Sequence, residues 1–253
     1  MSALSISYSV ASSLLAFATP QSWSLPQNGS LHGVLVDRHL SLNLWIFIAL
    51  AVLAHIILLS ALLFRREDGR TYRVPKVAAL ACLSLLFIAL TYRAETLWAA
   101  RYSGANLAAM QVEVTGVQFA WYFRYPGADA TFGRTLPGLV DAGAGNPLGI
   151  DATDPHSGDD LVSSELVLPV GREVDLRLRA QDVIHGFFVP AMRLKQNAVP
   201  GDVFHIHFTP QKTGSYAILC SQVCGLGHYR MQATMRVVSE TDYAAWLRLK
   251  ETR

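Results

Sequence analysis

The sequence predicts a membrane-anchored all-β protein, in which an N-terminal two-helix transmembrane hairpin precedes a Greek-key β-barrel or β-sandwich. Its 253 residues are 51% hydrophobic and only 16% charged, whereas an ordinary soluble domain carries roughly 25% charged residues. The long apolar runs all lie before residue 100. From Met110 onward, short segments alternate apolar and polar residues, as strands do. These observations exclude both a wholly soluble and a wholly embedded protein.

The outer N-terminal segment, residues 1–40, has two interpretations that the sequence leaves open. An apolar stretch ends in Ala16-Phe17-Ala18, just before Thr19 and Pro20, and this resembles the cleavage site of a signal peptide over residues 1–18. No Lys or Arg precedes that site. The missing positive charge favours the alternative, a retained N-terminus on the outer side.

Two apolar runs predict the hairpin over residues 41–100. The first, at about 41–64, has 24 residues without a formal charge, enough for a helix to cross a hydrocarbon core of about 30 Å. The second, at about 75–98, is shorter, but its flanking basic side chains can snorkel to the interfaces. The connecting loop, residues 65–74, is rich in arginine, so the positive-inside rule places it in the cytoplasm.

Residues 101–253 are predicted to form an outer β domain, beginning with a continuous β segment from Gln111 to Tyr125. The chain is expected to end in a short amphipathic helix over Glu240–Lys250. Between Gly133 and Ser164 lies a long loop rich in aspartate. It lacks EF-hand spacing, so a solvated surface excursion is favoured over a calcium-binding or partner-docking role.

A cluster near the C-terminus carries the chemistry, because Cys220, Cys224, His228 and Met231 fall within twelve residues. Sulfur and imidazole ligands together suit copper, zinc or an iron–sulfur cluster. Met231 favours copper, since a thioether is a poor zinc ligand but a usual weak axial ligand of copper, and an iron–sulfur cluster would normally need four cysteines.

The second thiol of this cluster requires an explanation, because a mononuclear blue-copper loop needs only one. Two coppers bridged by both sulfurs are the simplest explanation, and they would need a second imidazole. His185, expected in a loop after the strand Val174–Leu178, is the candidate. Four neighbours of the cluster are expected to exclude water from it: Phe187, Phe188, Val189 and Leu226.

At these residues the sequence resembles subunit II of the haem-copper terminal oxidases, whose outer cupredoxin domain holds the binuclear CuA centre. The resemblance runs from Ser41 and includes DVIHGFFVPAMRLKQNAVPG and CSQVCGLGHYRM. It implies that Cys220 and Cys224 supply the bridging thiolates and that His185 and His228 supply the terminal imidazoles. The axial ligands would be the thioether of Met231 and the backbone carbonyl of Gln222.

The resemblance implies a subunit of a cytochrome c oxidase. Its copper centre would accept electrons from a cytochrome c type donor and pass them to haem in subunit I, where oxygen is reduced to water and protons are pumped. On this interpretation the chain itself has no catalytic residue and transfers electrons only. Its partners would be subunit I, the other oxidase subunits and the donor protein. The location would be the plasma membrane of a bacterium, with the copper domain on the periplasmic side.

Two positions depart from the usual family pattern. Phe119 stands where most members have the tryptophan that receives the electron, and Trp121 matches the second tryptophan of that cluster. Gln222 replaces a glutamate whose side chain helps to bind magnesium, and a neutral amide is a weaker ligand for a hard cation. We therefore expect electrons to enter near Phe119 and Trp121, and we leave magnesium out of the predicted sites.

Other functions were weighed against this one. A quinol oxidase subunit with a metal-free cupredoxin domain is disfavoured by the intact ligand set. A copper subunit of a nitric oxide reductase-type enzyme remains the alternative. The outer domain contains 14 basic and 15 acidic residues, so no partner nucleic acid is expected, and donor docking would need a local patch, with Asp182 and the acidic loop as candidates.

Overall fold

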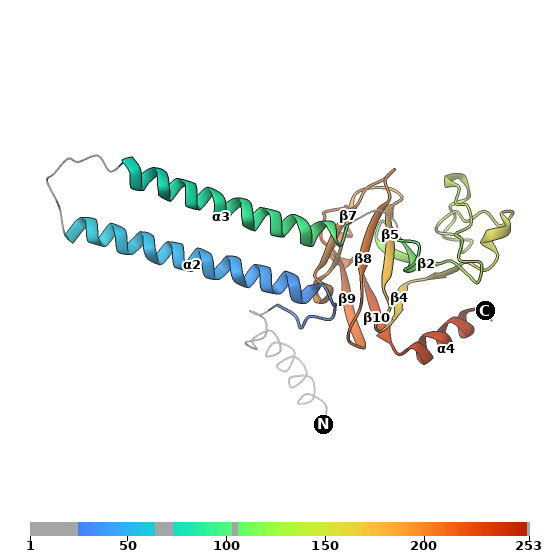
Figure 1. Cartoon of the computed structure of the whole chain (residues 1–253). Coiled ribbons are helices and arrows are strands. Elements are labelled where there is room, and N and C mark those ends of the chain that lie inside the picture. Colours follow the sequence, from blue (N-terminus) through green and yellow to red (C-terminus); the bar gives the residue numbers. More distant parts are fainter. Residues whose placement is uncertain (1–24, 64–72, 103–105, 252–253) are drawn as a thin grey trace, which may run out of the picture.

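The computed structural model describes residues 25–63, 73–102 and 106–251 (Figure 1). The possible signal peptide and most of the predicted cytoplasmic loop lie outside the described residues. Two long helices, α2 (Gly33–Leu63) and α3 (Arg73–Ala99), extend side by side from a β domain. The chain thus has the predicted form of a helical hairpin followed by an all-β domain.

Both helices are long and apolar enough to cross a membrane, judged by length and composition. Helix α2 begins at Gly33 rather than at residue 41. The prediction was too short because it followed only the apolar run, whereas the helix continues through the charged turn that contains Asp37. The Ser30 hydroxyl accepts a hydrogen bond from the Gly33 backbone N–H at 3.1 Å, which is a helix-capping interaction.

The β domain is a sandwich of two five-stranded sheets. The first has the order β3-β2-β1-β5-β8, and the second has the order β4-β10-β9-β6-β7. The strand bounds are β1 Met110–Val117, β2 Ala120–Tyr125, β3 Leu161–Ser163, β4 Glu165–Pro169, β5 Val174–Ala180, β6 His185–Val189, β7 Leu194–Ala198, β8 Phe204–Phe208, β9 Gly214–Cys220 and β10 Gln232–Val238. Pairing is parallel in β1/β5 and β4/β10 and antiparallel in the other pairs.

The hydrophobic core consists of alternate residues on the inner faces of the two sheets. Val112, Phe123 and Leu176 come from the first sheet, and Leu166 and Phe187 come from the second; all five are fully buried. Period-two alternation on half-buried strands gives this arrangement. It provides the rigid support on which the loops at the sandwich edges are held.

The predicted segment Gln111–Tyr125 is two strands and not one. Strands β1 and β2 form an antiparallel hairpin in which Val117 pairs with Ala120, so the turn lies at Gln118 and Phe119. Neither residue is a usual turn former, and this is why the sequence concealed the turn. It is held by long-range contacts, since Asp182 accepts a hydrogen bond from the Gln118 backbone N–H at 2.7 Å.

The helices are fixed to the β domain by polar contacts at their outer ends. Arg193 pairs with Asp37 of α2 through two hydrogen bonds of 2.7 and 2.9 Å. The Tyr102 hydroxyl, just after α3, donates to the carbonyl of Lys195 at 2.9 Å. Arg193 directly precedes β7 and Lys195 lies within it, so one edge of the second sheet anchors both helices.

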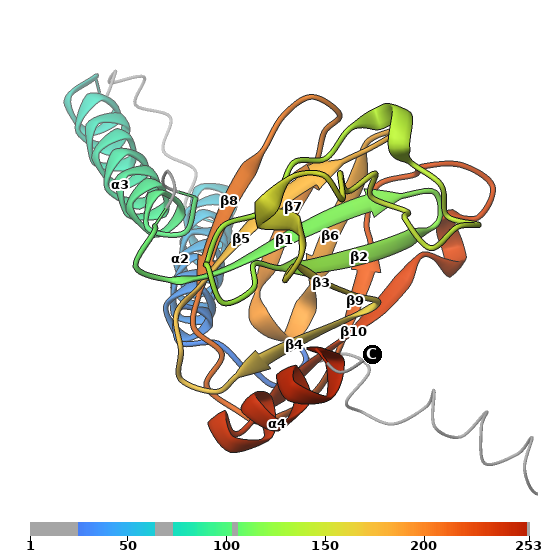
Figure 2. The ribbon, with the colours of Figure 1, turned by 90° about the vertical axis from the view of Figure 1, so that its right-hand side faces the viewer.

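The C-terminal helix α4 (Glu240–Glu251) confirms the predicted amphipathic helix and lies beneath β4 and β10 (Figure 2). The Ser239 hydroxyl accepts a hydrogen bond from the Asp242 backbone N–H at 3.1 Å. Trp246 packs edge-on against Tyr125, with ring centroids 5.1 Å apart. An aromatic contact of this geometry stabilises the attachment of the helix to the sandwich.

Several aspartates of the acidic loop are engaged in ion pairs and hydrogen bonds within the domain. Asp151 pairs with Arg134, and Asp154 accepts from the Arg134 backbone N–H at 2.8 Å. Asp160 pairs with Arg124, a buried arginine of β2 whose guanidinium also lies 3.7 Å from Glu113. Burial is the main cause that raises the pKa of Asp160, although Arg124 and the Gly133 backbone N–H oppose it. Asp151 and Asp154 therefore organise the loop internally, and Asp160 attaches it to the first sheet.

We expect the substitution Arg124→Met to lower the free energy of unfolding of the outer domain by about 3–5 kcal/mol, because it leaves the buried Asp160 carboxylate without its cation. Glu113 would lose one of its two cations and keep Arg179. Arg236→Met is the matched control. Arg236 pairs with Glu165 at 3.5 Å with both side chains about half exposed, so its loss should cost less than about 1 kcal/mol. Denaturant unfolding measures both, and equal effects would contradict the prediction.

Candidate metal centre

The predicted ligand loop joins β9 to β10 and is closed at its base by backbone hydrogen bonds. The Cys220 N–H donates to the Met231 carbonyl at 3.1 Å, and the Ser221 N–H donates to the Gly186 carbonyl of β6 at 2.9 Å. A short 3-10 turn, His228–Arg230, lies inside the loop. Two neighbouring strands therefore fix both ends of the loop.

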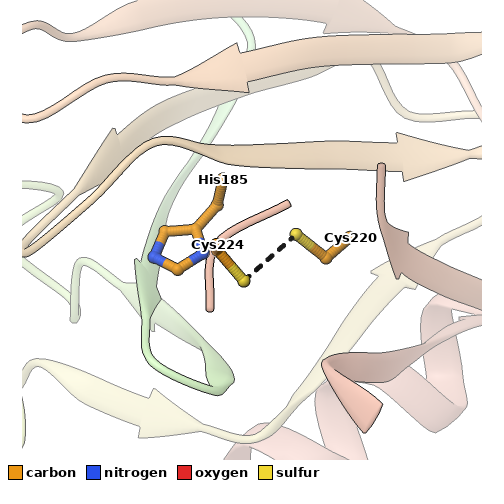
Figure 3. A group of neighbouring side chains, drawn as sticks. All are labelled: His185, Cys220 and Cys224. Atoms are coloured by element: carbon orange, nitrogen blue, oxygen red, sulfur yellow. Dashed lines mark hydrogen bonds between the residues drawn. The ribbon is translucent and has the colours of Figure 1, made fainter. Parts of the chain in front are cut away.

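Three side chains gather at one point above this base. The Sγ atoms of Cys220 and Cys224 lie 3.9 Å apart. One ring nitrogen of His185 and the two sulfurs all lie within 4.8 Å of one another (Figure 3). Among the described residues this is the one such group of His, Cys, Asp and Glu side chains with the spacing of a metal site.

The other three predicted ligands approach the same thiols. Nδ1 of His228 and Sδ of Met231 each lie 3.7 Å from Sγ of Cys224. The backbone carbonyl oxygen of Gln222 lies 3.1 Å from Sγ of Cys220. The fold therefore brings together all six residues that the sequence selected as ligands.

His185 occupies a different kind of position from the one expected. It is the first residue of strand β6 and pairs with Ala198 of β7, whereas the sequence placed it in a loop. The prediction was wrong because Asp182-Val183-Ile184 already makes the turn after β5, so the chain is extended again by His185. The imidazole is completely buried, which gives it a fixed orientation.

The two nitrogens of His185 have contrasting surroundings. Nε2 lies 2.8 Å from a carboxylate oxygen of Asp182, while buried Nδ1 has no hydrogen-bond partner. Since an ionised carboxylate can only accept, the hydrogen bond assigns the proton to Nε2 and leaves a free electron pair on Nδ1. An orphaned, buried acceptor beside two thiols is the arrangement that a metal ion would satisfy.

Asp182 maintains this arrangement, a role that the sequence interpretation did not assign to it. Burial raises its pKa, but hydrogen bonds from the backbone N–H of Gln118, from His185 and from the backbone N–H of Val183 outweigh burial, so the net shift is downward. The carboxylate is therefore ionised at neutral pH. The i, i+3 spacing of Asp182 and His185 was the only sequence signal for this pair.

Glycine allows the close approach of β6 to the ligand loop. A Cβ on Gly186 would lie 2.4 Å from Oγ of Ser221 and 2.8 Å from the backbone nitrogen of Gln222. The second contact is with backbone, so no side-chain rotation could relieve it. Any larger residue at this position must displace the loop.

The two aromatic residues expected at the electron entrance differ in burial: one lies in the core and the other at the surface. Trp121 is buried, and its ring meets His185 edge-on at 5.8 Å and Phe187 at 5.3 Å. Phe119 is 39% exposed. Its ring covers Gly227, where a Cβ would lie only 2.4 Å from it.

The expected apolar shield of the cluster is only partly formed. Phe187 and Val189 are fully buried, but Leu226 is 96% exposed. The prediction was wrong for Leu226 because the loop turns this side chain outward, together with exposed Val223 and Tyr229. An apolar apex thus faces solvent around the cluster.

Burial is the main cause that raises the pKa of the Cys224 thiol to about 11, and the neighbouring Cys220 adds to it. In the metal-free domain this side chain is therefore a neutral thiol at neutral pH. A metal ion binds the thiolate, so binding must release this proton.

The fold and the site together define a membrane-anchored β-sandwich protein with a candidate metal centre on its outer domain. The comparisons with known proteins then identify the family. The family model for the periplasmic domain of cytochrome c oxidase subunit II matches residues 110–238, about half of the chain. The chain belongs to the cytochrome c oxidase subunit II family.

Named relatives agree with this assignment. The chain is 40% identical over 146 residues to an alternative cytochrome c oxidase subunit 2 of Bradyrhizobium diazoefficiens, covering 57% of this chain and 52% of the relative. It is 34% identical over 148 residues to cytochrome c oxidase subunit 2 of Cereibacter sphaeroides, covering 55% and 49%. The matched parts thus span about half the length of these relatives.

A solved structure is also similar, namely the periplasmic domain of subunit II of cytochrome oxidase of Bradyrhizobium japonicum. Its TM-score is 0.40 and its identity 26%, and the match covers 56% of this chain and 94% of that chain.

We expect Gly186→Ala to displace the ligand loop and to cost about 1–3 kcal/mol of domain stability through overpacking. The metal retained per chain after dialysis should fall with it. Gly158→Ala is the matched control, since Gly158 has a φ of -69° and nothing within 4 Å of an added Cβ. Undiminished metal retention in the Gly186 variant would show that metal binding does not need the close approach of β6 to the ligand loop.

Proposed function

We propose that the chain is the copper-bearing, electron-accepting subunit of a cytochrome c oxidase. The observation that supports this most is the orphaned Nδ1 of buried His185 beside two thiols whose sulfurs lie 3.9 Å apart. Because Asp182 holds the proton on the opposite nitrogen, the imidazole has only the metal-binding tautomer available.

The donor set suits a pair of copper ions. Thiolates, imidazoles and a thioether are soft or borderline ligands, and the thioether distinguishes copper from zinc. The proposed ligands are the side chains of His185, Cys220, Cys224, His228 and Met231 and the backbone carbonyl of Gln222. Two copper ions held there would supply a one-electron carrier.

The chain's own residues favour electron transfer over catalysis at this site. The ligand loop is tied at its base to β6 and β10, and the His185 ring is clamped by Asp182 and Trp121. A site held so rigidly changes little between redox states, and six protein ligands would leave no position for a substrate. We accordingly assign no catalytic residue to this chain.

The proposed partners are the donor and the acceptor of the transferred electron. A cytochrome c or similar small redox protein would dock where Phe119 is exposed beside the apolar apex of Val223, Leu226 and Tyr229, and Trp121 would lie directly beneath. Haem in subunit I would receive the electron, and oxygen would be reduced to water there, coupled to proton pumping. Asp182 is engaged with His185, so we do not assign it to docking.

The proposed location is the plasma membrane of a bacterium, with both helices spanning the bilayer and the copper domain on the periplasmic side. Two apolar helices and membership of a periplasmic-domain family support it. The relatives are named as cytochrome c oxidase subunits, which favours oxygen over nitric oxide as the final acceptor.

The full chain loaded with copper should bind two copper ions, and its EPR spectrum should show one unpaired electron shared by both. Cys224→Ser should abolish the shared-electron signal, because it removes one bridge. Cys82→Ser, in the apolar helix α3 and outside the site, is the matched control and should leave the spectrum unchanged. One copper per chain with a single-copper hyperfine pattern would refute the binuclear assignment.

Met231→Leu should retain both copper ions but raise the reduction potential, because it removes a weak donor that favours the oxidised state. Each tenfold loss of that preference corresponds to about 59 mV for one electron. Redox titration followed by optical absorption measures the shift. Complete loss of copper would show that the thioether is a principal ligand.

A further inference from the structure

A second candidate binding site, which shares no residue with the metal centre, lies between the outer ends of the two long helices. It is a pocket of about 220 Å³ whose apolar lining comes from Val36 and Leu40 of α2 and from Ala94 and Leu97 of α3. Arg101 and His39 line the same pocket. Apolar walls with basic groups among them form an amphipathic cavity.

Arg101 is a buried cation that lacks a counter-ion. The residue is only 5% exposed, and its Nη1 donates to the carbonyl of Arg193. Its Nε and Nη2 have no hydrogen-bond partner, and no acidic side chain among the described residues forms an ion pair with it. A buried charge in this condition is costly unless an anion accompanies it.

His39 has the same deficit. Its Nε2 lies 3.1 Å from the amide nitrogen of Asn43, while its buried Nδ1 has no partner. In the assigned orientation of the amide, Nε2 accepts and Nδ1 carries the proton. Asp37, the only acidic residue of α2, is already paired with Arg193. The pocket therefore offers donors from two side chains without an acceptor.

We propose that this pocket binds an anionic phospholipid, with the phosphate at Arg101 and His39 and an acyl chain along the groove between α2 and α3. The apolar lining belongs to two helices that are long and apolar enough to span a bilayer, and the most apolar window of each helix is exposed, so an acyl chain lying along them would reach the pocket. Trp98 and Tyr102 also line it, and these residue types are enriched at the level of lipid headgroups.

The lipid would have a structural consequence for the whole chain. Arg101 holds the carbonyl of Arg193, and Arg193 in turn holds Asp37. A phosphate on Arg101 would therefore extend a chain of hydrogen bonds that joins the end of α3, the start of β7 and α2. The anchored orientation of the outer domain would then depend on an anionic lipid in the outer leaflet.

Native mass spectrometry of the full chain in detergent tests the proposal, with phosphatidylglycerol as the probe and phosphatidylcholine of the same acyl chains as the comparison. We expect phosphatidylglycerol to be retained in preference to phosphatidylcholine. Arg101→Gln should lower that retention about tenfold, since it removes charge-assisted hydrogen bonds. Arg93→Gln, which removes an exposed arginine of the same helix, should leave retention unchanged.

A second variant keeps the test decisive if Arg101→Gln impairs folding. Ala94→Trp fills the pocket but leaves Arg101 intact, and it should also abolish retention of phosphatidylglycerol. Copper content provides an independent measure of the outer domain, and it should be unchanged in both variants. The proposal therefore stands or falls separately from the assignment of the metal centre.

Three outcomes would overturn the proposal. Equal retention of the two lipids would remove the role of the anionic headgroup. Competition by inorganic phosphate as strong as that by phosphatidylglycerol would indicate a site for a free anion. If Arg101→Gln leaves the phosphatidylglycerol content of the assembled oxidase unchanged, another subunit and not a lipid covers the pocket.

Discussion

The hydrogen bond between Nε2 of His185 and the carboxylate of Asp182 is the interaction on which the candidate metal centre depends. It fixes the tautomer of a buried ring, and it directs the unpartnered nitrogen toward the thiols of Cys220 and Cys224. The same carboxylate accepts from the backbone of Gln118, and the Gln118 side chain donates to the carbonyl of Cys224. One ionised side chain thereby joins the β1–β2 turn, the start of β6 and the ligand loop, which come from both sheets.

Several acidic side chains of the outer domain are engaged within the domain. Asp160 and Glu113 neutralise the buried Arg124, and Asp151 and Asp154 organise the acidic loop on the side of the sandwich away from the helices (Figure 1). Large apolar side chains face solvent around the ligand loop, and Leu226 is the most exposed of them. Association with a donor would then rest on a small apolar contact with Phe119 at its edge, and less on the long-range electrostatic steering that a charged surface provides.

A few polar contacts attach the helices to the sandwich. Arg193 reaches Asp37, and the hydroxyl of Tyr102 reaches the carbonyl of Lys195. Both contacts involve β7, which pairs with β6 and so lies next to the strand that begins with His185. The orientation of the metal centre relative to the membrane is therefore set by the same sheet edge that supports one of its ligands. At this junction, Nε and Nη2 of the Arg101 guanidinium and Nδ1 of His39 have no hydrogen-bond partner.

The sequence by itself determined the features that depend on residues close together in the chain. The length of the apolar runs predicted two helices, alternation predicted most of the strands, and four candidate ligand residues within one loop predicted copper. Tertiary structure alone decided the rest. The turn at Gln118 and Phe119 is held by Asp182 and not by turn-forming residues. Helix α2 extends back to Gly33 because Ser30 caps it and Arg193 pairs with its charged turn. His185 becomes a strand residue, and Leu226 turns outward. For the turn and for the start of α2, the partners Asp182 and Arg193 lie far away in the sequence, where local propensity carries no information about them.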